Sequence, residues 1–174
     1  INAYKDKIKA DKMAMEQVNW ELIEKNTNLE KYQRSTTIDM ELAGQIQEMI
    51  LSQQKLLIPD WDIAYYFKPK FGASGDFYDF YVDNNELKGF GIFDVAGHGV
   101  SSALITVLIK PVIAKYFYNG DAFNLAKVFQ SVNEHINREF SELDLYITGV
   151  LLRFNKSTIE YISAGHPELL LKRA

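Results

Sequence analysis

Apolar side chains recur along the first fifty residues at alternating steps of three and four positions. Asp11 and Lys25 are the two exceptions among the first ten members, and residues 1–40 contain no Gly or Pro. The members are Ile1, Tyr4, Ile8, Asp11, Met15, Val18, Leu22, Lys25, Leu29 and Tyr32, continued by Thr36, Asp39, Ala43, Ile46 and Ile50. This heptad seam predicts one long helical linker over residues 1–50, with a weak joint at 35–37.

Two interpretations of this helix are open. It can lie on its own domain as an amphipathic helix, or it can pair with a second copy as a parallel dimeric coiled coil. We favour the coiled coil, and therefore a homodimer, because the seam is narrow and sustained. Asp11 and Lys25 lie in the seam, where they would weaken pairing and set its register.

Beyond Pro59 the pattern changes to short β-type runs separated by turns and two helical segments. The predicted strands are 61–67, 77–82, 87–95, 146–154, 158–163 and 168–172, and the predicted helices are 100–118 and 122–140. Asp83-Asn84-Asn85 is turn chemistry, so strands 77–82 and 87–95 should form a hairpin. Pro111 should kink or divide the first helix, and Asp121 should cap the second. Residues 51–174 therefore predict an α+β layered domain.

Composition narrows the function classes. Lys and Arg total 19 against 23 Asp and Glu, so no basic excess favours nucleic acid or an anionic membrane surface. Cys is absent, which excludes thiolate metal sites and cysteine nucleophiles. We find no run of about 18 apolar residues, so we expect no membrane contact by this segment. We expect a cytoplasmic protein, either free or tethered through an upstream region, because the sequence opens at Ile1 and is interpreted as a piece of something longer.

Two loops place an Asp at the edge of an apolar strand, next to small residues. They are residues 73–80, which contain Asp76, and residues 93–100, which contain Asp94. A carboxylate at such a place is costly unless it is solvated, paired or bound to a cation. A hairpin between the two strands would bring Asp76 and Asp94 together, and hard divalent cations prefer such oxygen ligands. A single loop of this kind is better explained as a solvated turn or an Asx-type hydrogen bond, and the spacing of two loops around one hairpin leaves the turn and the cation site about evenly matched.

Several ordered motifs resemble those of one family. G-D-F-Y-D-F stands at 75–80, D-V-A-G-H-G at 94–99 and A-G-H-P at 164–167, after the lead-in I-Q-E-M-I-L at 46–51. Over about residues 39–171 the chain resembles the bacterial SpoIIE/RsbU-like branch of the metal-dependent PPM serine/threonine phosphatases. The resemblance implies an α-β-β-α sandwich and an active site with two Mn²⁺ or Mg²⁺ ions.

The resemblance also implies roles for particular residues. Asp76 and Asp94 match the metal-binding, catalytic Asp residues, Asp94 bridging the ions, and Val95 would add its backbone carbonyl. A metal-activated water would then attack phosphorus in line, without a protein nucleophile. Asp79 would lie nearby and hold metal-bound water. His98 and His166 are expected to have structural roles, His166 by shaping a loop near the site.

Two departures from the family pattern bear on activity. Ser74-Gly75-Asp76 stands where the family has Gly-Gly-Asp, which keeps a small residue before the Asp. The family's later Asp ligands follow A-G-H-P, whereas the sequence given ends at Ala174. We therefore expect a phosphatase domain that is incomplete at its C-terminus, with weakened metal binding.

Two functions are compatible with these features. The first is a metal-dependent phosphoserine/phosphothreonine protein phosphatase of bacterial signalling, whose substrate would be a phosphorylated anti-sigma-factor antagonist. In that case a change of helix register at 35–37 would move Ile46 and Ile50 against the domain and alter the metal loops. The alternative is a catalytically inactive or truncated phosphatase-fold module that acts in dimerisation and signal relay. A calcium-binding structural domain is disfavoured, because no EF-hand spacing occurs.

Overall fold

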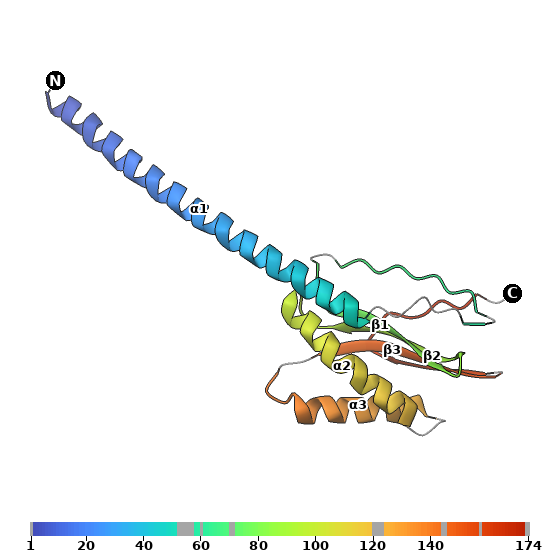
Figure 1. Cartoon of the computed structure of the whole chain (residues 1–174). Coiled ribbons are helices and arrows are strands. Elements are labelled where there is room, and N and C mark those ends of the chain that lie inside the picture. Colours follow the sequence, from blue (N-terminus) through green and yellow to red (C-terminus); the bar gives the residue numbers. More distant parts are fainter. Residues whose placement is uncertain are drawn as a thin grey trace. The chain divides into compact units, whose positions relative to one another are not determined.

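The computed structural model describes residues 2–51, 58–59, 61–69, 72–119, 124–143, 146–156 and 158–172. Its elements are α1 (Asn2–Leu51), β1 (Asp76–Asp83), β2 (Glu86–Val95), α2 (Val100–Asn119), α3 (Leu125–Glu139), β3 (Ile147–Asn155) and β4 (Thr158–Ala164) (Figure 1). The chain forms two compact units, residues 1–39 and 40–174.

The predicted N-terminal helix is confirmed. It is unbroken at the expected weak joint, where Thr36 Oγ1 and Thr37 Oγ1 donate to the carbonyls of Tyr32 and Gln33, each at 2.9 Å. These bonds let the two Thr residues satisfy their hydroxyls within the helix. Every side chain from residue 4 to residue 39 is solvent-exposed, including the apolar seam.

The four strands form one antiparallel sheet in the order β1-β2-β3-β4. The predicted hairpin is confirmed: Asp83 pairs with Glu86 across a two-residue loop. Asn84 and Asn85 occupy that loop with φ of 51° and 62°. Asn tolerates this left-handed backbone better than other non-Gly residues, and such a turn matches the twist of the strands it joins.

One face of the sheet packs on α2 and α3, which lie on the same side of it (Figure 1). The rings of Phe77 and Phe93 stack at 4.9 Å between centroids, and those of Tyr81 and Phe117 at 4.1 Å. Side chains alternate along each strand, so Phe77, Phe93 and Val95 face the helices while their neighbours face the other way.

The other face of the sheet carries a smaller apolar cluster of Ile58, Phe80 and Leu87. Residues 61–69 run along it, with Trp61 4.6 Å from Phe154 and Tyr65 5.0 Å from Tyr78 between ring centroids. This segment contributes aromatic rings, but in the part of the chain that is described it forms no strand. The strands predicted at 61–67 and 168–172 are therefore wrong, because neither segment has a paired neighbour there.

The described residues thus confirm an α+β fold with one antiparallel sheet and helices on one face. A second sheet, as an α-β-β-α sandwich requires, does not occur among them. The dimeric coiled coil stays a prediction.

Helix α2 runs unbroken through Pro111, which the sequence analysis expected to divide or kink it. Pro111 has no N–H to donate to the carbonyl four residues before it. Because Pro111 is exposed, water can solvate that carbonyl instead. Helix α3 begins at Leu125 with Asn124 as its cap, whose side chain accepts from Lys127 N at 3.2 Å. The predicted cap, Asp121, lies outside the described residues.

Contrary to the sequence expectation, α2 is long and apolar enough to cross a membrane by length and composition. In the fold it buries Ser102, Ala103, Thr106, Ile109, Ile113 and Phe117. Helices that pack in a folded domain meet the same criterion, so length and composition alone do not show a membrane span.

Candidate metal centre

Asp76 and Asp94 meet at one end of the sheet. Asp76 opens β1, Asp94 is the second-last residue of β2, and the register pairs their Cα atoms directly. Residues opposite each other on neighbouring strands share a face and have Cβ atoms about 5 Å apart. Both side chains are exposed. The predicted approach of the two carboxylates is therefore confirmed, on the face opposite α2 and α3.

The electrostatics of this pair favour a cation. Partial burial raises the pKa of Asp76, and the neighbouring Asp94 carboxylate raises it further. His166 and the Ser74 hydroxyl act in the opposite direction. Two like charges held opposite each other destabilise the fold, and a divalent cation between them would reverse that cost.

The donor set of the pair fits part of a hard-cation site. Within the described ranges, no group of three or more His, Asp or Glu side chains is placed to hold a metal ion. The carboxylates of Asp76 and Asp94 would supply two protein ligands, and a bound cation would keep much of its water there.

The Val95 carbonyl lies beside this pair. Val95 N donates to Gly75 O at 3.1 Å, and its side chain is fully buried. A Cβ atom added to Gly75 would lie 2.5 Å from Val95 O and 3.2 Å from Ser102 Cβ. Gly75 therefore keeps the space around that oxygen open, which explains the small residue before Asp76. Whether Val95 binds a metal stays a prediction.

The A-G-H-P motif lies at the same end of the sheet as the Asp pair. Asp94 pairs with Thr148 on β3, and Thr148 Oγ1 is hydrogen-bonded to His166 Nδ1 at 2.9 Å. Ser163 Oγ donates to the His166 carbonyl at 3.1 Å, which closes the turn after β4. His166 thus shapes the loop beside the Asp pair, as predicted. His98 is exposed in the loop before α2.

The expectation for Asp79 is wrong. It lies three residues after Asp76, so strand alternation places it on the helix-facing side of β1. Its side chain is 4% exposed and pairs with Lys110 Nζ of α2 at 3.1 Å. Burial raises the pKa of Asp79, and the Lys110 ammonium lowers it. Asp79 therefore ties α2 to the sheet, away from the candidate metal ligands.

Gln47, which no sequence pattern marked as functional, joins the end of α1 to the Asp76 loop. Gln47 is 2% exposed, and its Nε2 donates to Ser74 O at 2.6 Å and Thr106 Oγ1 at 2.7 Å. Its Oε1 accepts from Ser74 N at 3.0 Å, and Ser74 Oγ accepts from Asp76 N at 3.0 Å. Hydrogen bonds therefore connect α1 to the backbone of a candidate metal ligand. The sequence feature that could have indicated this role is the position of Gln47 within I-Q-E-M-I-L, directly after the seam residue Ile46.

The same contact corrects the expectation for Ile46 and Ile50. These side chains are 41% and 47% exposed, so they are not the residues that hold α1 against the domain. Instead α1 approaches the loop at Gly44, where a Cβ atom would lie 2.0 Å from Gly72 O. Close backbone approach and the Gln47 amide make this contact.

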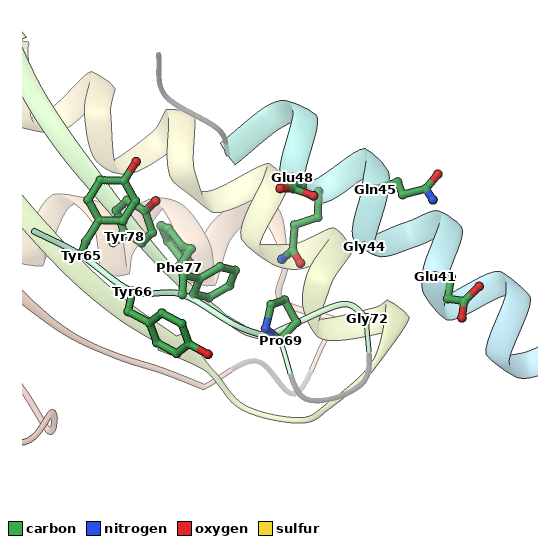
Figure 2. Close-up of a pocket in the computed structure, with 12 residues that line it drawn as sticks. Glu41, Gly44, Gln45, Glu48, Tyr65, Tyr66, Pro69, Gly72, Phe77 and Tyr78 are labelled. Carbon is green, nitrogen blue, oxygen red and sulfur yellow. The ribbon is translucent and has the colours of Figure 1, made fainter. Parts of the chain in front are cut away.

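A cavity of about 610 Å³ lies beside the Asp76 strand, between the end of α1 and residues 65–69. Figure 2 shows Tyr65 and Tyr78 on one side of it and Glu48 on the helix opposite. Burial, and then the hydrogen bond with Tyr65, raises the pKa of Tyr78 to about 12. The described lining has two glutamates and no Lys or Arg, so it repels rather than attracts a phosphate group.

Known proteins match this chain in sequence and in fold. The family model described as Stage II sporulation protein E (SpoIIE) matches residues 87–174. The chain is 31% identical over 146 residues to the phosphoserine phosphatase RsbP and 25% identical over 145 residues to the phosphoserine phosphatase RsbU, both of Bacillus subtilis (strain 168). These alignments cover 81% and 82% of this chain but only 36% and 42% of those proteins. The chain thus spans about two fifths of the length of these relatives.

A solved structure shares the fold. The SiaA-PP2C domain of Pseudomonas aeruginosa superposes with a TM-score of 0.58 at 23% identity, over 70% of this chain and 50% of that one. At this identity the similarity shows the fold.

Replacing Lys110 by Met should destabilise the domain by about 3 kcal/mol, because it leaves Asp79 buried without its ammonium partner. The pKa of Asp79 in the folded state should then rise further above its value in the unfolded chain. A raised carboxyl pKa favours the folded state at low pH, and this advantage is lost as the pH rises through the folded-state pKa. Urea unfolding at several pH values between 5 and 8 should therefore show stability falling with pH in Lys110→Met.

The matched control for this prediction is Lys115→Met, an exposed position on the same helix. Equal stability losses in the two variants, with the same pH dependence, would contradict the role given to the buried ion pair.

Replacing Gln47 by Leu should lower the free energy of unfolding by about 1–3 kcal/mol, because the Ser74 N–H and C=O lose their buried partner. The loop should also open more often, so hydrogen exchange at the Asp76 amide should accelerate. Chemical unfolding and amide exchange measure the two effects. Gln45→Leu, an exposed neighbour on α1, should change neither; identical behaviour of the two variants would refute the link from α1 to the loop.

Proposed function

The chain belongs to the SpoIIE family of PPM-type phosphatases, and on this premise we propose that it hydrolyses phosphoserine or phosphothreonine on a protein substrate. The observation that carries the proposal is the direct pairing of Asp76 with Asp94 at the end of β1 and β2. The relatives RsbP and RsbU are named phosphoserine phosphatases, which supports the same reaction class.

Asp76, Asp94 and the Val95 carbonyl would hold two Mn²⁺ or Mg²⁺ ions. Bound there, the ions supply a water of lowered pKa and positive charge for the phosphoryl oxygens. The chain's own residues prepare the place: Gly75 leaves room around the Val95 carbonyl, and Ser74, held by Gln47, fixes the Asp76 backbone. The Asp pair supplies the negative charge that draws the cations to this end of the sheet.

The second candidate is a module without phosphatase activity that relays a signal through dimerisation. It is supported by the small ligand set, since no group of three or more His, Asp or Glu side chains among the described residues is placed to hold a metal ion. The two proposals differ in whether metal-dependent turnover occurs.

We place the substrate among phosphorylated antagonists of anti-sigma factors, on the strength of the family resemblance. A cytoplasmic location, with or without a tether upstream, is part of the same proposal. Regulation would come from the N-terminal helix, because α1 reaches the Asp76 loop through Gln47 and Ser74. A dimer through the heptad seam would then set the position of α1.

The test of the reaction is hydrolysis of 4-nitrophenyl phosphate and of a phosphoserine peptide, with Mn²⁺ and with chelator. We expect Mn²⁺-dependent turnover, and a loss of at least about a hundredfold in Asp94→Asn, because a carboxylate ligand is removed. Asp83→Asn is the control, since Asp83 is exposed at the opposite end of β1. Turnover that survives in chelator or in Asp94→Asn would refute the proposed site, and no turnover at all would favour the relay module.

The test of the dimer is sedimentation velocity. The chain should sediment as two copies, because the exposed seam gains burial only in a partner. Leu22→Asp places a charge in the seam and should shift the chain to the monomer. Ile23→Asp changes the neighbouring exposed residue outside the seam and should leave the dimer intact. A monomeric parent chain would contradict the coiled coil.

A further inference from the structure

A second cavity lies directly behind the metal end of the sheet, on the face that packs against α2 and α3. Its volume is about 340 Å³, and its walls come from α2, α3, and the ends of β2, β3 and β4. The metal ligands proposed above are not among its lining residues, although the lining residue Thr148 is the register partner of Asp94. This cavity is separate from the larger cavity beside α1, with which it shares no lining residue.

The floor and one wall of this cavity are aromatic. A Cβ atom on Gly149 would lie 2.3 Å from Cδ1 of Phe93, so the Phe93 ring rests on the bare backbone of β3. Phe129 of α3 also lines the cavity, and its ring lies 6.4 Å from that of Phe93 between centroids, so the two rings are neighbours in the lining. Two neighbouring aromatic rings in the lining favour an aromatic occupant, through offset or edge contacts.

The chemistry of the lining excludes a charged occupant. The described lining is aliphatic and aromatic apart from Tyr146, Thr148, Asn133 and Asn137, and it contains no charged residue. An ionic ligand would therefore lose water without gaining an opposite charge. Asn133 and Asn137 lie one helical turn apart on α3 and are exposed, so their amides stand at the rim. These amides can form a hydrogen bond with one polar group of a ligand that is otherwise apolar.

The volume sets the size of the occupant. An apolar cavity of about 150 Å³ is known to hold benzene, so this one has room for roughly two fused rings. We infer that the cavity behind the sheet binds a neutral bicyclic aromatic molecule with one polar group directed at the Asn133–Asn137 rim.

Such a molecule would touch the strands that carry the Asp pair. Phe93 directly precedes Asp94, and Thr148 is the register partner of Asp94 on β3. Any effect of binding on metal affinity rests on the proposed function above. Binding itself does not, and it is tested in the presence of chelator.

The experiment uses 2-naphthol as the probe and the full 174-residue chain labelled with ¹⁵N. Titration should shift the amide resonance of Gly149, with a dissociation constant on the order of 1 mM or tighter for a ligand of this size. The charged analogue 2-naphthoate should bind at least about tenfold more weakly, because the lining offers it no cation. Equal binding of the two probes, or no shift with 2-naphthol, would overturn the inference.

Variants locate the probe. Val132→Phe fills the cavity from α3 and should abolish the Gly149 shift, while circular dichroism shows that the chain stays folded. Should Val132→Phe not fold, Ile136→Phe fills the same space from the next turn and decides the question. Ala126→Phe makes the same kind of change on the exposed face of α3 and should leave binding unchanged. Binding that survives the filling variant would place the probe elsewhere and refute the site.

The cavity inference and the phosphatase proposal can be refuted independently of each other. A chain that binds 2-naphthol but shows no Mn²⁺-dependent turnover retains this inference and loses the phosphatase proposal. A chain with Mn²⁺-dependent turnover and no 2-naphthol binding does the reverse.

Discussion

The register between β1 and β2 is the constraint on which the rest of the molecule depends. A two-residue turn at Asn84 and Asn85 and a one-residue register shift between Tyr81 and Val82 set it together, and it places Asp76 opposite Asp94 and Phe77 opposite Phe93. Because side chains alternate, a slip of one residue would bury the carboxylates under the helices and expose the rings. The hydrophobic core therefore protects the geometry of the charged pair, since the apolar burial holds together two like charges that would otherwise separate.

Polar contacts then connect this sheet end to the helices around it. Gln47 satisfies both backbone groups of Ser74, and Asp79 forms a buried ion pair with Lys110. Each is expensive to break, because an unpaired polar group in the interior keeps the cost of its lost hydration. Such contacts have few alternative arrangements, so they make the position of α1 and α2 specific.

The predictions that were confirmed are those that depend only on residues close together in the sequence. The hairpin, the four strands of the sheet and the long helix follow from alternation, turn residues and heptad spacing. Residues 61–67 and 168–172 have strand-like composition yet form no strand in the described chain, because a strand exists only through its partner. The expectation for Asp79 was wrong because closeness to Asp76 in the sequence does not put the two side chains on the same face of the strand. Gln47 was missed because its partner, Ser74, is 27 positions away.

The sequence by itself determined the family and the hairpin, because ordered motifs and turn residues carry that information locally, and it indicated that Asp76 and Asp94 approach each other. It also determined the helical character of the first fifty residues. Tertiary structure alone decided which acidic residue is buried with Lys110, how α1 contacts the Asp76 loop, and that space remains between α3 and the sheet. These features depend on how distant surfaces fit, and packing between segments far apart in the chain leaves no periodic signal in either segment.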